Sequence, residues 1–159
     1  MKIRIGQGID FHRLEKDLNL WLGGVKIHAD KGCVAHSDGD VLLHAICDAL
    51  LGAAGLRDIG YYFPDSNSEF KNIDSKILLG RTIDLIREKG YEVINIDCTV
   101  CLERPKISPF IPEMKAVISK ISGTDTDGIA IKATTTEKLG FTGREEGIMA
   151  MAVALLSGK

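Results

Sequence analysis

Three features are missing from this sequence of 159 residues: a long apolar run, a large net charge and the apolar core of a signal peptide. A membrane-spanning helix needs about 20 consecutive apolar residues, and no segment reaches that length. Lysine and arginine total 20 against 22 aspartate and glutamate residues, and the net charge of −2 provides no bulk attraction to nucleic acid or to a membrane surface. The N-terminal residues enter a strand pattern directly. We therefore expect a cytoplasmic protein without a nucleic-acid or membrane partner.

Cysteine is scarce as well, and its spacing argues against two common uses. Cys98 and Cys101 form a C-x-x-C, but they lie in a predicted strand over 91–102, where residues three apart point to opposite faces. A redox pair of this kind gains its low thiol pKa at a helix N-terminus, and no second C-x-x-C completes a structural zinc site. We expect all four cysteines to be small, buried apolar residues: Cys33, Cys47, Cys98 and Cys101.

What the sequence does contain is typical of a globular chain of mixed α and β structure. Hydrophobic residues make up 45% and charged residues 26%, and the length suits a single domain, 1–159, with a core of its own. Alternating apolar residues predict strands, and capping residues before apolar stripes predict helices. The expected strands are 2–11, 20–27, 91–102 and 128–133, and the expected helices begin after Ser37, after Asp74 and at Glu113.

Three of these segments carry more specific expectations. Ser37 is expected to cap the first helix, with Asp40 completing an S-x-x-D box. The segment 147–156 is apolar at nearly every position, so periodicity does not separate a buried strand from a buried helix, and both remain open. The helix after Asp74 is expected to bury one stripe, formed by Ile77, Leu78, Ile83 and Ile86.

One aspartate and two histidines have the clearest chemical potential. Asp10 and His12 are two apart in a predicted strand, so their side chains project from the same face. With His44 they would form a nitrogen and oxygen ligand set suited to zinc or a similar divalent ion. Three protein ligands leave one coordination position open, as expected where a metal acts on a substrate. The alternative is a surface ion pair beside a strand, which contributes little to stability.

Polar loops nearby are candidates for the same site. Asp40 precedes His44 by four residues on one helix face, so it could orient the imidazole of a metal ligand. It could equally serve only the helix N-terminus, where a carboxylate is favoured. The loops 58–60 and 63–67 are acidic and turn-forming, and they could hold substrate hydroxyls or be solvated turns.

A second polar stretch, residues 132–144, is typical of an anion-binding site. Three consecutive threonines, backbone amides at a strand end, two lysines and an arginine provide donors for phosphate oxygens. Glu137 among these cations is compatible with phosphate binding if it holds a hard cation such as Mg²⁺. The alternative is a β-rich threonine run with surface charges at Glu137 and Lys138.

These motifs occur together in an order that resembles one enzyme family over the whole chain. They are Gly8-x-Asp10-x-His12, Ala35-His36-Ser37-Asp38-Gly39-Asp40-x-x-x-His44-Ala45, Asp58-Ile59-Gly60, Phe63-Pro64-Asp65, Arg104-Pro105-Lys106 and the stretch from Lys132 to Arg144. With them the sequence closely resembles the 2-C-methyl-D-erythritol 2,4-cyclodiphosphate synthases, the ring-forming enzymes of non-mevalonate isoprenoid biosynthesis.

The resemblance implies a metal-dependent phosphorus–oxygen lyase. Its substrate would be 4-diphosphocytidyl-2-C-methyl-D-erythritol 2-phosphate, which is cyclised to 2-C-methyl-D-erythritol 2,4-cyclodiphosphate with release of CMP. One Zn²⁺ per subunit would bind at Asp10, His12 and His44. Mg²⁺ or Mn²⁺ would bind at Glu137 together with the substrate diphosphate.

The resemblance also assigns catalytic and substrate-binding positions. His36 and Thr135 match the catalytic residues that stabilise the transition state in the family. The implied substrate-binding residues are Asp10, Phe11, His12, His36, Ser37, Asp58, Ile59, Gly60, Phe63, Pro64, Asp65, Ser66, Asn67, Pro105, Lys106, Ile107, Ser108, Ala133, Thr134, Thr135, Thr136, Glu137, Phe141 and Arg144.

The implied fold is an α+β two-layer sandwich with a four-stranded mixed sheet and helices on one face. Three chains would assemble around their sheets as a homotrimer with sites between subunits, and 147–156 would be a strand covered by the trimer core. Phe141 and Arg144 would line an axial channel able to hold an isoprenoid diphosphate. Two other functions use the same ligand set: a zinc-dependent phosphate-ester hydrolase, and a non-catalytic nucleotide-binding sensor module.

Overall fold

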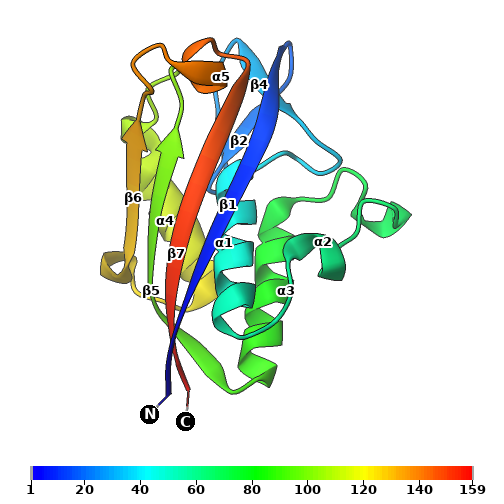
Figure 1. Cartoon of the computed structure of the whole chain (residues 1–159), viewed down its shortest axis with the longest axis vertical. Helices are drawn as coiled ribbons and strands as arrows, with labels where there is room; N and C mark the ends of the chain where they lie inside the picture. The colour runs from blue at the N-terminus through cyan, green and yellow to red at the C-terminus, as the bar shows by residue number, and fades with distance from the viewer. Residues whose placement is uncertain (1, 159) are drawn as a thin grey trace.

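A mixed sheet of five strands runs the length of the molecule (Figure 1). In the computed structural model, which describes residues 2–158, the strand order is β4-β1-β7-β5-β6. Neighbouring strands are antiparallel except for β5 and β6, which are parallel. The strands are β1 (Lys2–Lys16), β4 (Lys31–Val34), β5 (Tyr91–Cys101), β6 (Ile129–Thr134) and β7 (Gly147–Gly158).

The expectation of a four-stranded sheet was wrong because β1 is longer than predicted. The strand continues past residue 11 to Lys16, and its last residues pair with the short edge strand β4. Leu14 lies opposite Cys33 in this ladder, and both side chains are buried. The added edge strand leaves the predicted α+β class unchanged, and that class is confirmed.

The segment 20–27, predicted as one strand, is a hairpin of two short strands. These are β2 (Leu20–Leu22) and β3 (Val25–Ile27), which form a separate two-stranded sheet. The turn falls on Gly23 and Gly24, whose φ angles of 59° and 76° lie in the left-handed region that favours glycine. The backbone N–H groups of both glycines donate to the carboxylate of Asp40, the residue before the first helix.

Three longer helices cover one face of the sheet, as the resemblance implied (Figure 1). α1 packs on β1 and β7, α3 packs on α1, and α4 packs on β6 and α3. The helices are α1 (Val41–Ala53), α2 (Ile59–Tyr62), α3 (Ser75–Glu88), α4 (Ile111–Ser122) and α5 (Gly140–Gly143), with 3₁₀ turns η1 (Ser68–Phe70), η2 (Ser108–Phe110) and η3 (Thr126–Gly128).

Two details of the helix predictions were wrong. Asp40, and not Ser37, caps α1, because its carboxylate accepts from the Leu43 backbone N–H at 3.0 Å, whereas the Ser37 hydroxyl accepts from Gly39 in a local turn. The cap of α3 at Asp74 is confirmed. In the predicted stripe of α3, however, Ile77 is 49% exposed. Leu79 is buried instead, because it shares the inward face of the helix with Leu78, Ile83 and Ile86.

Glycine in β1 lets α1 lie directly on the strand backbone. A Cβ atom at Gly8 would come within 1.9 Å of the carbonyl oxygen of Ala45, and one at Gly6 within 2.1 Å of that of Ala49. No side chain fits in so small a gap. The close approach places the first turn of α1, which carries His44, beside the middle of β1.

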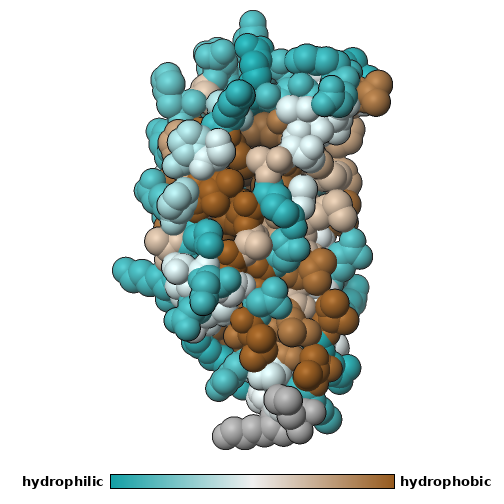
Figure 2. Space-filling view, turned by 90° about the vertical axis from the view of Figure 1, so that its left-hand side faces the viewer, coloured by the Kyte–Doolittle hydropathy of each residue, from teal (hydrophilic) through white to brown (hydrophobic). Residues whose placement is uncertain are grey.

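β7 resolves the segment that the sequence left open. It is a strand, as the family resemblance implied, and Ile148, Ala150, Ala152 and Ala154 are buried on its helix side. Its other face belongs to an uncovered apolar surface, which Figure 2 shows from the side on which β6 lies in Figure 1. Exposed apolar residues of β1 and β7 on this sheet face are Ile3, Ile5, Ile9, Phe11, Met151 and Val153.

Two further expectations concern cysteine and the membrane. All four cysteines are buried, which confirms the expected burial, and none is paired in a disulfide. Within residues 2–158, no helix has both the length and the apolar character needed to cross a membrane.

Candidate functional site

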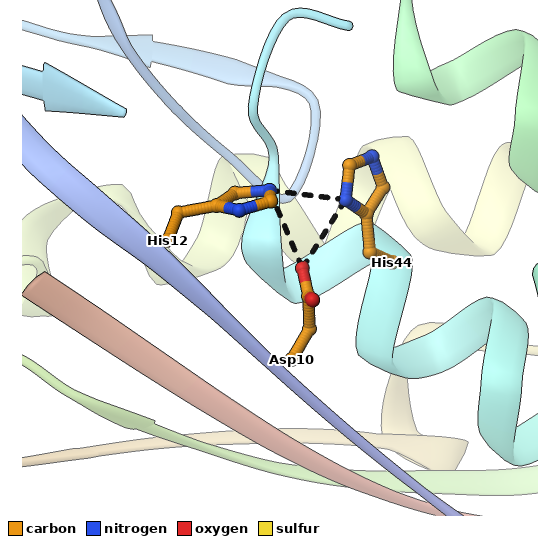
Figure 3. A group of neighbouring side chains, drawn as sticks. All are labelled: Asp10, His12 and His44. Atoms are coloured by element: carbon orange, nitrogen blue, oxygen red, sulfur yellow. Dashed lines mark hydrogen bonds and ion pairs between the residues drawn. The ribbon is translucent and has the colours of Figure 1, made fainter. Parts of the chain in front are cut away.

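Asp10, His12 and His44 meet at the junction of β1 and α1 (Figure 3). Asp10 and His12 project from the helix side of β1, and His44 comes from the first turn of α1. Nε2 of His12 lies 3.2 Å from Nδ1 of His44, and Oδ2 of Asp10 lies 3.3 Å from the first atom and 3.2 Å from the second. Among the described residues, this is the one group of three or more His, Cys, Asp or Glu side chains that could hold a metal ion.

The triangle of these atoms has the size that a tetrahedral metal centre requires. Zinc–ligand bonds of about 2.0–2.1 Å at tetrahedral angles place neighbouring ligand atoms about 3.3 Å apart. The three observed separations of 3.2–3.3 Å match this spacing. Two imidazoles and one carboxylate also suit a divalent ion and leave a fourth position for a substrate. The residues therefore fit the metal that the sequence predicted.

Burial and the charge of Asp10 act on the two histidines in opposite directions. The side chains of Asp10, His12 and His44 are only 27%, 16% and 11% exposed. Burial lowers the pKa of His12, although Asp10 opposes the change. Burial also acts to lower the pKa of His44, but its hydrogen bond to Asp10 and the Asp10 charge outweigh this and raise it. The lowered pKa of His12 favours its neutral form, which is the form that binds metals.

Asp40 supports the fold near the site, and its carboxylate bonds to backbone N–H groups instead of the imidazole of His44. Its carboxylate accepts from the backbone N–H groups of Gly23 at 3.0 Å, Gly24 at 2.6 Å and Leu43 at 3.0 Å. Burial raises the pKa of Asp40 to about 6, although the hydrogen bonds from Gly24 and Leu43 act to lower it. Of the two interpretations of Asp40, the structure favours the one at the helix N-terminus, extended by the β2–β3 turn.

A pocket of about 260 Å³ lies where β5 and β6 end. It is lined by all four residues predicted from 105–108 and by three of the four predicted from 133–136. Two further residues without a predicted role also line it. The two additional residues are Leu102 and Glu103. The lining is Leu102, Glu103, Pro105, Lys106, Ile107, Ser108, Ala133, Thr134 and Thr135.

The metal triad and this pocket lie at the same position along the strands, but three strands apart across the sheet. Asp10 on β1 pairs with Ala150 on β7, Ala150 pairs with Val100 on β5, and Val100 pairs with Ala133 on β6. Neighbouring strands are about 4.8 Å apart, so Asp10 and Ala133 are separated by about 14 Å within one chain. One chain therefore does not bring the two halves of the predicted site into contact.

The other residues predicted from the first half of the chain lie in the segment before α1, in α2 and in the loop after α2. Ser37 Oγ lies 3.3 Å from Nε2 of His44, whereas His36 is exposed to solvent. Asp58 is exposed at the start of α2, where its side chain makes no capping bond. Ile59 and Gly60 continue that helix. In the following loop Phe63 is buried, Pro64 is partly buried, and three residues are exposed: Asp65, Ser66 and Asn67.

The predicted residues beyond the pocket form the connection from β6 to β7. Glu137 is exposed, and its backbone has a left-handed φ of 53°. Thr136 bonds to Thr142 through its hydroxyl at 2.9 Å. The Phe141 ring lies 5.9 Å from that of Phe11, measured between centroids.

Three polar residues that had no role predicted from the sequence are connected to the site. Asp38 and Ser75 contact each other beside His44, and Glu103 lines the pocket. Asp38 lies within the quoted H-S-D-G-D motif, so its position was a usable signal. No local pattern in the sequence marks Ser75 or Glu103, because their hydrogen-bond partners lie more than 30 residues away in the sequence.

Comparison with known proteins gives one consistent result. The sequence model of the YgbB family matches residues 3–157. The chain is 60% identical over 157 residues to 2-C-methyl-D-erythritol 2,4-cyclodiphosphate synthase of Bacteroides fragilis, which covers 99% of each protein.

Solved structures agree with this match. The bifunctional IspDF of Campylobacter jejuni is similar with a TM-score of 0.95 and 46% identity, over 99% of this chain and 43% of that longer chain. A complex of Plasmodium falciparum IspF with CDP has a TM-score of 0.86 and 39% identity, over 99% of this chain and 97% of that one. The chain therefore belongs to the YgbB family, whose curated members of matching length include 2-C-methyl-D-erythritol 2,4-cyclodiphosphate synthases.

Proposed function

We propose that this chain cyclises 4-diphosphocytidyl-2-C-methyl-D-erythritol 2-phosphate to 2-C-methyl-D-erythritol 2,4-cyclodiphosphate and releases CMP. The observation that carries the proposal is the combination of an open divalent-metal triad with a separate pocket at the ends of β5 and β6. The pocket residues are those at which the family resemblance expects the cytidine diphosphate. Support also comes from the relative that was solved as a complex with CDP.

In the proposed reaction, an oxygen of the 2-phosphate attacks the β-phosphorus of the same molecule. A new phosphorus–oxygen bond closes the ring, the bond from the β-phosphorus to the bridging oxygen breaks, and CMP leaves with that oxygen and its electron pair. The protein needs no nucleophile of its own, which agrees with the burial of all four cysteines. Positioning of such groups can supply about 7–11 kcal/mol of barrier reduction.

Individual residues would fold the substrate and neutralise its charge. Zn²⁺ on the triad and Mg²⁺ or Mn²⁺ at Glu137 would stabilise the negative charge on the phosphates. His36 and Thr135, both exposed polar side chains, would donate hydrogen bonds to phosphate oxygens. Lys106 would attract the diphosphate from the pocket, and Asp58 would accept hydrogen bonds from the erythritol hydroxyls.

We also propose that three chains share their sites in a homotrimer. The separation of about 14 Å between the triad and the pocket of one chain supports this, because a neighbouring chain can bring its own pocket closer. The uncovered sheet face also supports it, since Ile5 is 72% exposed beside other apolar residues. A contiguous apolar surface of this kind marks an interaction face.

The experiment that tests the activity is ³¹P NMR of the protein mixed with the cytidyl substrate, Zn²⁺ and Mg²⁺. Signals of a cyclic diphosphate and of CMP support the proposal. Free inorganic phosphate would instead indicate the hydrolase, and an unchanged substrate spectrum would indicate the sensor module. A His12→Ala protein serves as the control for contaminating activities, since it lacks one ligand of the triad.

A further inference from the structure

Ser75 connects the metal triad to a carboxylate outside it. Nδ1 of His44 faces Asp10 and His12, whereas its Nε2 points away from them (Figure 3). That Nε2 lies 2.8 Å from Oγ of Ser75, and the Ser75 hydroxyl donates to Oδ1 of Asp38. His44, Ser75 and Asp38 thus form one continuous hydrogen-bonded chain.

The direction of each bond follows from the donors available. An ionised carboxylate only accepts, so the Ser75 hydroxyl gives its single proton to Asp38. The Ser75 oxygen can then only accept from His44, which requires a proton on Nε2. Without a metal, the hydrogen bond between Nδ1 and Oδ2 of Asp10 at 3.2 Å needs a proton on Nδ1 as well. A metal at the triad would take the place of that proton, and the ring would keep its proton on Nε2 and present the lone pair of Nδ1. The chain of bonds selects the tautomer that a metal at the triad needs.

Asp38 is itself held firmly by backbone groups. Its carboxylate accepts from the N–H of Ser75 at 3.0 Å and from that of Asp40 at 3.2 Å. Its own N–H donates to the carbonyl of Ile73 at 3.1 Å. The loop before α1 and the start of α3 are therefore joined at Asp38, and Ser75, the first residue of α3, is fully buried at this junction.

Other candidates for this role are weaker. The carboxylate of Asp40 accepts hydrogen bonds from three backbone N–H groups and forms none with the ring of His44. Ser37 Oγ is 3.3 Å from Nε2, longer than the distance from Ser75, and it already accepts from Gly39. Ser75 is thus the nearest partner of Nε2.

We propose that Asp38 and Ser75 are positioning residues that fix the tautomer and orientation of His44 and so set the affinity of the triad for Zn²⁺. This inference rests on the metal site of the proposed function. It concerns two residues outside the triad that would act through their bonds to His44. Partners of this kind alter metal affinity by about 10–100-fold in other proteins.

The test is the zinc dissociation constant, measured by competition with a chromophoric chelator. We expect Ser75→Ala and Asp38→Asn each to weaken zinc binding by about 10–100-fold. The matched control is Asp74→Ala, which removes the capping bond that the Asp74 carboxylate accepts from the backbone N–H of Lys76 at the start of the same helix and leaves the hydroxyl of Ser75 in place. This control should lower thermal stability and leave zinc affinity unchanged.

If both Ser75→Ala and Asp38→Asn bind zinc with wild-type affinity, this inference is wrong and the proposed metal site stands. If the wild-type protein binds no zinc, both the inference and the proposed metal site are wrong. A second measurement covers variants that fail to fold. In the zinc-loaded wild-type protein, ¹H–¹⁵N NMR should detect the proton on Nε2 of His44, with a nuclear Overhauser contact to Ser75. Zinc bound at Nε2 with the proton on Nδ1 would contradict the inference.

Discussion

Glu103 and Lys138 are joined by an ion pair and a hydrogen bond at the edge of the pocket where β5 and β6 end. Oε2 of Glu103 lies 3.1 Å from Nζ of Lys138, and Oε1 accepts from the Lys138 backbone N–H at 3.3 Å. Oε1 also accepts from the N–H of Thr136 at 3.2 Å, and the Glu103 side chain is only 4% exposed. These bonds hold Glu137 and Lys138 at φ angles of 53° and 67°, which residues other than glycine rarely adopt.

We predict that Glu103→Ala raises the KM for the cytidyl substrate by about tenfold, the effect of losing about 1.4 kcal/mol of hydrogen bonding. The reason is that the loop bearing Thr135 and Glu137 loses its support. Glu103→Gln should recover part of the loss, because its amide oxygen still accepts from the loop. The control is Glu69→Ala, which removes an exposed ion pair with Arg81 on another part of the chain. Steady-state kinetics with an unchanged KM in Glu103→Ala would contradict this role.

The second prediction concerns the contact between β1 and α1. Gly8→Ala should lower the free energy of unfolding by at least the 1–3 kcal/mol that is typical of overpacking, because its Cβ would overlap the Ala45 carbonyl. It should also weaken metal binding by displacing His44. Gly52→Ala is the opposite case, because Gly52 lies in α1 and a Cβ atom there would meet no atom closer than 3.9 Å. This substitution should raise the free energy of unfolding by about 0.5–1 kcal/mol. Urea denaturation at one fixed protein concentration measures both.

The third prediction concerns stability at alkaline pH. Burial raises the pKa values of Cys33, Cys47 and Cys98 to about 12, from a value of 9.0 for an exposed thiol. Between these two pH values the unfolded chain releases thiol protons that the folded chain retains, so stability is present below pH 9 and is lost as the pH rises toward 12. Each thiol contributes about 1.4 kcal/mol per pH unit in that window.

Cys98→Ala isolates this effect from the titration of lysine and tyrosine. Its free energy of unfolding should fall less steeply than that of the wild-type protein between pH 9 and pH 11. The measurement is a series of urea denaturation curves at fixed protein concentration. Identical slopes for the two proteins would exclude the thiol as the cause.

The fourth prediction concerns the axis of the proposed trimer. The family resemblance places Arg144 in an axial channel able to hold an isoprenoid diphosphate, but each Arg144 guanidinium already forms two 3.0 Å hydrogen bonds with Glu146 of its own chain. An isoprenoid diphosphate would have to replace this carboxylate. Geranyl diphosphate should therefore raise the melting temperature of the wild-type protein, raise that of Glu146→Gln more, and leave Arg144→Ala unchanged. Equal shifts in all three proteins would rule out Arg144 as the ligand.

The fifth prediction tests the shared site directly. His12→Ala lacks a metal ligand and Glu137→Ala lacks the proposed magnesium ligand, so each protein alone should be inactive. In a mixed trimer, one interface pairs an intact triad with an intact nucleotide loop, because every interface of a cyclic trimer is heterologous. Activity should reappear when the subunits exchange. Mixed trimers that are verified by native mass spectrometry and remain inactive would mean that each chain carries a complete site.

Local patterns in the sequence were sufficient wherever neighbouring residues decide the structure. The period of two along a strand placed Asp10 and His12 on one face, and the capping preference of aspartate located the start of α3 at Asp74. The motif order led to the family and to most of the residues that line the pocket at the ends of β5 and β6. These inferences needed only the geometry of one element at a time.

Tertiary structure decided what depends on contacts between distant segments. β7 is apolar at nearly every position, so only its two strand neighbours make it a strand. Asp40 was ambiguous until the β2–β3 turn supplied two donors to its carboxylate. Ser75 and Glu103 gave no signal in the sequence, because a hydroxyl or a carboxylate acquires its role from the donors and acceptors that the fold brings within 3 Å or so of it.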